Sequence, residues 1–179
     1  MFYLLSGLLY SALVGFVSSG VIDCSRAPDM FAIKNCCKLP ELNLTSFNKK
    51  CSKYVARITP CSFECVFNNT QSLNGTSLVL PKVEQLLQIA LNGDQKVIDI
   101  YMNGFRECSM QEAEMLRSLK RRRMEVVDNC SPMAVTYAIC AHRYVNINCP
   151  EGSWTNSQQC NEAKDYSINC NMPKGRKAT

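Results

Sequence analysis

The sequence predicts an all-α protein, a compact array of roughly six to eight short helices cross-linked by about six disulfides. Three observations lead to this prediction. Apolar residues recur mostly with the 3.6-residue period of an α-helix. The twelve cysteines are an even number and far exceed ordinary usage. An apolar leader indicates export to an oxidising compartment, where such cysteines form disulfides.

The leader is predicted to be a signal peptide covering residues 1–20. Residues 2–17 are apolar and uncharged, and small residues follow at Ser18, Ser19 and Gly20. An uncleaved anchor is the alternative, but the run of about 16 residues is shorter than the ~20 that span a bilayer. We expect residues 21–179 to form one domain of a secreted, extracellular protein, with a polar, partly ordered C-terminal tail at 161–179.

Composition argues against nucleic-acid and metal binding. The net charge of +5 is spread along the chain and peaks at residues 120–123, where no aromatic residues are interleaved. Such a run is usually a solvated helix face and sometimes a dibasic processing site. The chain has one histidine, so the paired Cys/His spacings of zinc sites are missing. We expect no metal and no cofactor.

The first half of the chain is predicted to contain four helices. They are expected at residues 28–38, 46–57, 60–67 and 80–91. Pro60 closes the second of them. The polar stretch 68–77, which contains Gly75, is expected to be a loop, and Asn92-Gly93 ends the fourth helix.

Three further helices are predicted in the second half. Asp94 begins the first, and Ser109-Met-Gln-Glu112 is a capping-box sequence expected to begin the second at Met110. Ser131 and Pro132 are expected to open the third as N-cap and first helical residue, and it should end near residue 148, before Pro150. We expect no β-hairpin, and residues 152–179 should be a polar segment held by Cys160 and Cys170.

The cysteine spacing predicts short helices stapled crosswise. Cys61 and Cys65 are four residues apart, so on a helix they share one face and should reach separate partners. Cys140 and Cys149 would lie on opposite sides of a helix. Adjacent cysteines at 36 and 37 must also diverge. Spacing alone leaves the connectivity open.

From Cys51 the spacing reads Cys-x9-Cys-x3-Cys-x42-Cys-x21-Cys-x9-Cys-x8-Cys-Pro-x9-Cys, and Cys36-Cys37 is followed by Pro40. Over about residues 36–160 this resembles the Plus-C class of insect odorant-binding proteins, which has the six cysteines of ordinary members, extra cysteines and a proline directly after the sixth. The resemblance implies an odorant-binding-protein-like domain with an apolar cavity between its helices.

The resemblance also implies a disulfide pairing. It joins Cys61 to Cys140, Cys108 to Cys149, and Cys65 to either Cys51 or Cys37. The remaining cysteines are expected to be paired with partners left open, namely Cys24, Cys36, Cys130, Cys160 and Cys170.

The function implied by the resemblance is that of a secreted carrier, with no enzymatic activity, that moves small hydrophobic molecules through aqueous lymph. Odorants, pheromones or other lipophiles would be its ligands, and a membrane odorant receptor its second partner. We expect a monomer or homodimer. The alternative is a secreted disulfide-rich protein-interaction module, such as an inhibitor or salivary effector. The basic run and the polar tail would favour this alternative.

Candidate cavity residues come from the apolar stripes, and ordinary core packing is the alternative for each. They are Leu86, Leu87, Ala90, Val97, Ile98, Tyr101, Phe105, Met115, Val135 and Ile139, with Tyr137 as a hydroxyl anchor and Trp154 as a cap on the pocket or the core. His142 is expected to be a partly exposed helix residue or a pH-sensitive latch. Candidate glycosylation sites are Asn68 and Asn74, with Asn43 ranked below them and Asn129 disfavoured by its neighbour Cys130.

Overall fold

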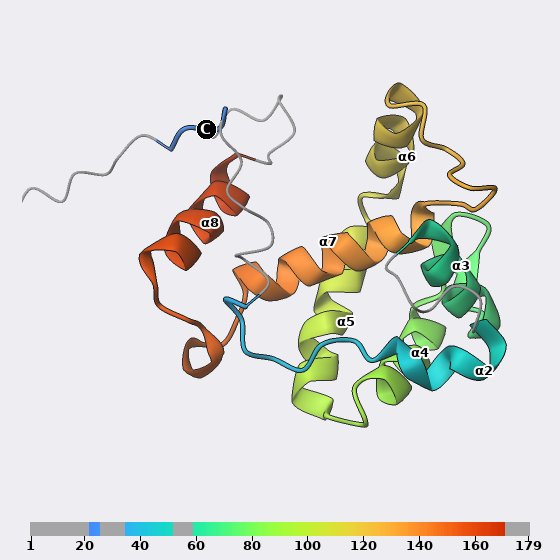
Figure 1. The fold of residues 1–179 in the computed structure, drawn as a ribbon, viewed down its shortest axis with the longest axis horizontal. Coiled ribbons are helices and arrows are strands. Elements are labelled where there is room, and N and C mark those ends of the chain that lie inside the picture. The colour runs from blue at the N-terminus through green and yellow to red at the C-terminus, as the bar shows by residue number, and fades with distance from the viewer. Residues whose placement is uncertain (1–21, 26–34, 52–58, 171–179) are drawn as a thin grey trace, which may run out of the picture.

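The computed structural model describes residues 22–25, 35–51 and 59–170 (Figure 1). Apart from one small hairpin, the elements in these ranges are helical, which confirms the all-α fold class. The helical elements are η1 (Leu44–Phe47), α2 (Asn48–Cys51), α3 (Pro60–Asn69), α4 (Leu80–Ala90), α5 (Gln95–Ser109), α6 (Glu112–Arg121), α7 (Met133–Ile147), η2 (Glu151–Ser153) and α8 (Gln158–Asn169). None of these helices is long and apolar enough to cross a bilayer.

Some predicted segments lie outside the described residues. The leader at 1–20 is one of them, and most of the helix predicted at 28–38 is another. Residues 35–38 are described and are not helical, so that prediction is wrong at its C-terminal end. The helix predicted at 46–57 is seen only as η1 and α2, because its second half is not described.

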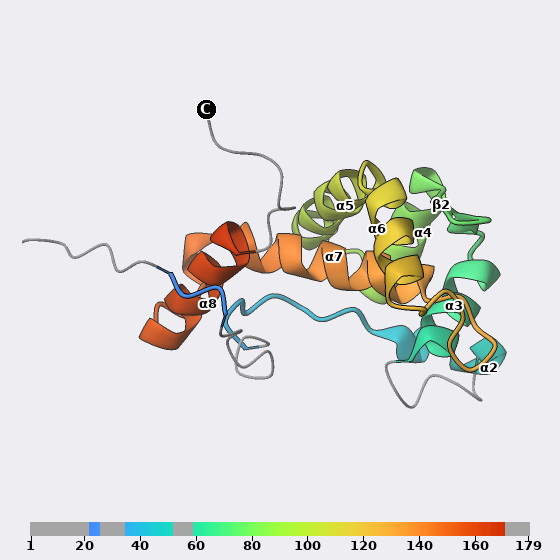
Figure 2. The same ribbon diagram turned by 90° about the horizontal axis from the view of Figure 1, so that it is seen from above.

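Helix α7 is the central element of the fold. It runs through the middle of the molecule, with α3 near its N-terminal end and α8 near its C-terminal end (Figures 1 and 2). Its most extensive contact is with α5, and α4 packs in turn against α5. The apolar stripes of these helices meet in one core, so burial of their side chains supplies the main stabilisation.

A glycine sets the distance between α5 and α7. A Cβ built at Gly104 would lie 3.0 Å from the Ala141 carbonyl oxygen and 3.2 Å from the Tyr144 Cβ. A side chain at this position would therefore fit only if α7 moved away by a few tenths of an ångström. One turn further along α5, Cys108 reaches Cys140 of α7, with 6.1 Å between their Cα atoms.

The helix ends follow local side-chain chemistry in most places. Thr59 forms a capping box with Ser62, and the Asp94 carboxylate accepts the Val97 N–H at the start of α5. Asn92 (φ 51°) and Gly93 (φ 74°) adopt the left-handed conformation that ends α4. These starts and stops agree with the sequence predictions.

Two predicted helix starts are wrong in detail. The Ser109 hydroxyl donates back to the Arg106 carbonyl oxygen, so it caps no new helix, and α6 begins at Glu112. Pro132 occupies the N-cap position of α7, and Met133 is the first helical residue. The Ser131 hydroxyl still accepts a hydrogen bond from the first helical N–H, that of Met133, at 3.3 Å, although Ser131 lies one residue before the N-cap.

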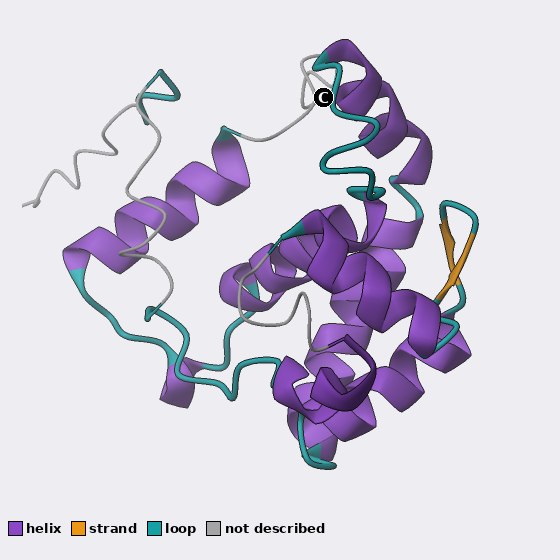
Figure 3. Cartoon of the chain, turned by 45° about the vertical axis from the view of Figure 1, so that its right-hand side comes forward, coloured by secondary structure: helices purple, strands orange, loops and turns teal. Residues whose placement is uncertain are grey.

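A hairpin and a helix appear where none was predicted. Strands β1 (Leu73–Asn74) and β2 (Ser77–Leu78) pair antiparallel across a turn with Gly75 at φ 62° (Figure 3). Leu73 and Leu78 face each other and pack against the core. The strands are too short for an alternation of apolar and polar residues to be visible in the sequence. Helix α8 buries only Cys160 and Ala163, so its apolar stripe is equally brief.

Candidate functional site

All twelve cysteines are paired. The disulfides are Cys24–Cys170, Cys36–Cys160, Cys37–Cys149, Cys51–Cys65, Cys61–Cys130 and Cys108–Cys140. The pairs Cys61–Cys140 and Cys108–Cys149 that the resemblance implied are therefore wrong. Cys65 takes Cys51, one of the two alternatives left open.

The error is a shift by one cysteine along the chain. Cys130 takes the role expected of Cys140, and Cys140 takes that expected of Cys149. The cause is geometric, because Cys140 lies beside the close crossing of α5 and α7, whereas Cys149 lies beyond the end of α7. The proline after Cys149 therefore follows the end of α7, and the cysteine before it is not the partner of Cys108.

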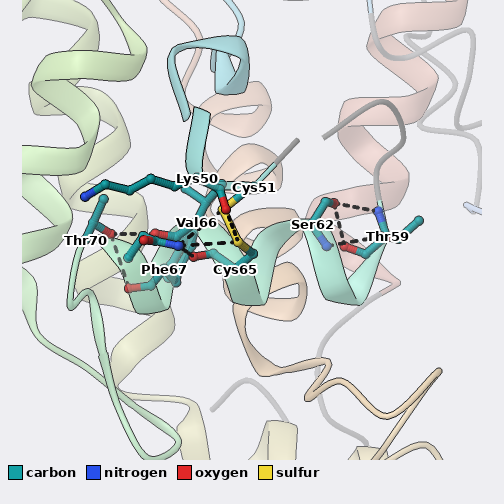
Figure 4. The surroundings of a disulfide bond; sticks show 9 residues. Lys50, Cys51, Thr59, Ser62, Cys65, Val66, Phe67 and Thr70 are labelled. Atoms are coloured by element: carbon teal, nitrogen blue, oxygen red, sulfur yellow. Dashed lines mark hydrogen bonds between the residues drawn. A yellow bond between two sulfur atoms is a disulfide. The ribbon is translucent and has the colours of Figure 1, made fainter. Parts of the chain in front are cut away.

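The shortest disulfide loop joins α2 to α3. Cys51 and Cys65 lie on neighbouring helices, and the Asn69 side-chain amide donates to the Cys65 carbonyl oxygen at 3.0 Å (Figure 4). The Thr70 hydroxyl donates to the Val66 carbonyl oxygen at 2.9 Å and so caps α3. This corner of the core is thus held by a covalent link and by satisfied polar groups.

Three disulfides bind the N-terminal segment to the C-terminal region. Cys36 and Cys37 reach different partners, as their adjacency predicted. Backbone hydrogen bonds join the same two regions. The Lys38 N–H donates to the Ser153 carbonyl oxygen and the Thr155 N–H donates to the Cys36 carbonyl oxygen, both at 2.7 Å. Residues 149–170 are therefore tied to the N-terminal segment, and most of residues 161–170 of the predicted tail belong to α8.

Most of the predicted lining residues meet in the core between α4, α5 and α7. Those buried there are Leu86, Leu87, Ala90, Val97, Ile98, Tyr101, Phe105 and Tyr137. Met115 and Val135 are partly buried and pack against the same core. The interior is thus aliphatic and aromatic, and the structure brings the predicted stripes together.

Two predicted residues lie elsewhere. The Ile139 side chain is 60% exposed, so its assignment to the lining is wrong. Helix α7 is apolar on nearly every side, and its sequence period therefore could not show which face is buried. Half-buried Trp154 lies against α8: its indole N–H donates to the Asn161 side-chain oxygen at 2.9 Å, and the Lys164 ammonium group lies 5.0 Å from its ring centre.

The sequence analysis missed the aromatic contribution of α3. Phe63 and Phe67 are both buried, and the Phe67 ring lies 6.2 Å from that of Phe105. The signal was available, because the two aromatics are four residues apart and so share one face of a helix. Helix α3 therefore contributes to this core together with α4, α5 and α7.

Two tyrosines, Tyr101 and Tyr137, bring hydroxyl groups into this apolar cluster. The Tyr137 hydroxyl donates to the Thr76 carbonyl oxygen at 3.1 Å, and the Tyr101 hydroxyl lies 3.5 Å from Nδ1 of His142. Burial, with a smaller effect of the Glu41 carboxylate, raises the pKa of Tyr101 to about 12. Burial also raises the pKa of Tyr137. Both hydroxyls therefore keep their protons at neutral pH and can donate hydrogen bonds.

No group of three or more His, Cys, Asp or Glu side chains among the described residues is placed to hold a metal ion. His142 is half-buried on α7 beside Tyr101. No family model and no curated protein matches the chain.

Proposed function

We propose that this chain is a secreted carrier that binds small hydrophobic molecules between α3, α4, α5 and α7. The observation that carries the proposal is the composition of that interior. Buried aliphatic and aromatic side chains form it, and Tyr101 and Tyr137 add hydroxyl groups to the same cluster. Interhelical ligand sites are typically apolar with a few placed polar groups.

The order of the disulfides supports the same function. Among the six successive cysteines from Cys51 to Cys140, the first pairs with the third, the second with the fifth and the fourth with the sixth. This is the interlocked order implied by the resemblance to odorant-binding proteins, displaced by one cysteine. The pattern favours a ligand of the odorant, pheromone or general lipophile type and delivery to a membrane odorant receptor.

Export is part of the proposal. Six disulfides form and persist in oxidising compartments, and the apolar leader at 1–20 has the features of a signal peptide. The sequon residues Asn68 and Asn74 are both exposed, as glycosylation in the secretory pathway would require.

Binding of a fluorescent apolar probe tests the proposal. The oxidised wild-type protein should enhance and blue-shift the emission of N-phenyl-1-naphthylamine, and unlabelled lipophiles should displace it. Failure of the folded wild-type protein to bind this probe or any of a panel of lipophiles would overturn the proposal.

A matched pair of variants locates the site. Ala90→Leu enlarges a buried residue of α4 inside the proposed interior, whereas Ala163→Leu makes the same change in the buried face of α8. We expect the first to weaken probe binding about tenfold, equivalent to ~1.4 kcal/mol, and the second to leave it unchanged. Circular dichroism and thermal melts check that both variants fold, since overpacking alone costs about 1–3 kcal/mol. Equal effects would place the site elsewhere.

The second candidate, a protein-interaction module, is favoured by one specific observation. Met110 (74% exposed) precedes α6 and Val126 (65% exposed) follows its basic run, so this part of the chain exposes both apolar and cationic side chains. Absence of probe binding, together with loss of a partner's binding on substitution of these two residues, would favour this candidate over the carrier.

A further inference from the structure

The basic run Lys120-Arg121-Arg122-Arg123 lies at the C-terminal end of α6, and every residue from 120 to 126 is exposed. Helix α6 stands away from the bundle formed by α5 and α7 (Figures 1 and 3). The run is therefore presented to solvent at one extremity of the described molecule.

The backbone at this point is weakly held. Helix α6 has no buried residue, and its apolar side chains Met115, Leu116 and Leu119 are only partly buried. Arg123 has φ 53°, a left-handed conformation that is unfavourable for a residue with a side chain. Opening the last turn would break the bonds from the Arg123 and Met124 N–H groups to carbonyls of α6 but would remove few packing contacts.

The run also has free cationic groups. Glu114 accepts hydrogen bonds from Arg117 and Arg121, which lowers the pKa of its carboxyl group. No acidic partner of Lys120, Arg122 or Arg123 occurs among the residues that the structure describes. Their side chains are available to carboxylates of another protein, with which arginine forms paired, charge-assisted hydrogen bonds.

Most of the disulfides connect the part of the chain before the basic run to the part after it. Five of the six join a cysteine before residue 123 to a cysteine after residue 124, and only Cys51–Cys65 lies on one side. A break in the backbone here would therefore leave both parts covalently joined. The two nearest crossing disulfides, Cys61–Cys130 and Cys108–Cys140, anchor both sides of the break to the core.

We propose that residues 120–123 are a processing site, at which a secretory endoprotease specific for paired basic residues cuts the bond between Arg123 and Met124. Water is the second reactant: the Arg123 carbonyl carbon becomes a carboxylate, and the Met124 nitrogen becomes a new amino terminus. The mature protein is then two chains joined by five disulfides. The inference depends on the proposed export and not on the bound ligand.

The cut releases one end of α6. The other end stays attached, because the Glu112 carboxylate accepts hydrogen bonds from the Thr76 and Ser77 hydroxyls of the hairpin, and Cys108 is bonded just before α6 begins. After processing, α6 would remain joined to the chain at its N-terminal end only.

Electrophoresis of the protein secreted by an animal cell host tests the processing. We expect one band without reductant and two bands with it, ending at Arg123 and beginning at Met124 by mass spectrometry. The triple variant Arg121→Gln, Arg122→Gln, Arg123→Gln should stay a single chain under both conditions. A charge-matched control with Lys82→Gln, Lys96→Gln and Arg106→Gln, which lie on α4 and α5, should be cut like the wild type.

A second experiment removes the dependence on export. Purified, oxidised protein is treated with a furin-type endoprotease beside an unstructured peptide carrying the same four basic residues. We expect both substrates to be cut, and the folded protein to keep its near-ultraviolet circular dichroism. An intact protein beside a fully cut peptide would overturn the proposal, as would separation of the fragments without reductant. Absence of the protein from the medium would count against export alone, because this second experiment still tests the site.

Discussion

Gly104 of α5 lies directly against Ala141 of α7, with 3.0 Å between a Cβ built at Gly104 and the Ala141 carbonyl oxygen. This contact sets the separation of the two helices that form most of the core. It also brings Cys108 within bonding reach of Cys140. The close crossing at Gly104 and the disulfide one turn further along α5 thus join the same two helices.

Replacement of Gly104 by alanine should destabilise the protein. The added methyl group must displace backbone atoms of α7, at a cost of about 1–3 kcal/mol that outweighs any gain from the higher helix propensity of alanine. Urea unfolding measures the difference. Gly152→Ala is the control, because its added Cβ would meet nothing within 4 Å, and its effect should stay within about 0.5 kcal/mol. Equal stabilities of the two variants would contradict the close crossing.

Thiol counting should distinguish the observed pairing from the one implied by the resemblance. Removal of a true pair, Cys61→Ser with Cys130→Ser, leaves no free thiol and lowers the free energy of unfolding by about 2–5 kcal/mol. Cys61→Ser with Cys140→Ser should instead strand the thiols of Cys130 and Cys108. Titration with a thiol reagent under denaturing conditions gives the count. Two thiols from the first variant and none from the second would reverse the assignment.

Alkaline pH should destabilise the fold through Tyr101. Its pKa is about 12 in the fold and near 10 in the unfolded chain, so the folded state disfavours the ionised hydroxyl. The stability contributed by this group is complete below pH 10 and is lost as the pH rises towards 12. Urea unfolding at pH 9 and 11.5 should show a smaller drop for Tyr101→Phe than for the wild type. An identical drop would exclude Tyr101 as a source of the pH dependence.

Glycosylation should occur at the two exposed sequons before and within the hairpin. Asn68 lies in the last turn of α3 and Asn74 lies in β1, and both residues are exposed. Asn68→Gln and Asn74→Gln should each remove one glycan in protein secreted by a eukaryotic host. Asn129→Gln serves as the comparison, because its sequon contains the disulfide-bonded Cys130 and we expect no glycan there. Mass spectrometry after glycosidase treatment gives the occupancy of each site.

Much of the candidate site could be predicted because it depends on local periodicity. The stripes of α4 and α5 are amphipathic, so the buried positions of Leu86, Ile98 and Phe105 followed from their spacing. The same reasoning failed for Ile139, since α7 is apolar on nearly every side and its exposed face is decided by which neighbours pack against it.

The helical class and the helix ends at Asp94 and Asn92-Gly93 could be predicted from the sequence, because each depends on residues close together in the chain. Tertiary structure alone decided the disulfide partners and the presence of α8. Several cysteines were available to each partner along the chain, and the packing of α5 against α7 places Cys140 beside Cys108. Helix α8 buries just two residues, and three disulfides between the N-terminal segment and the region after α7 hold its surroundings in place.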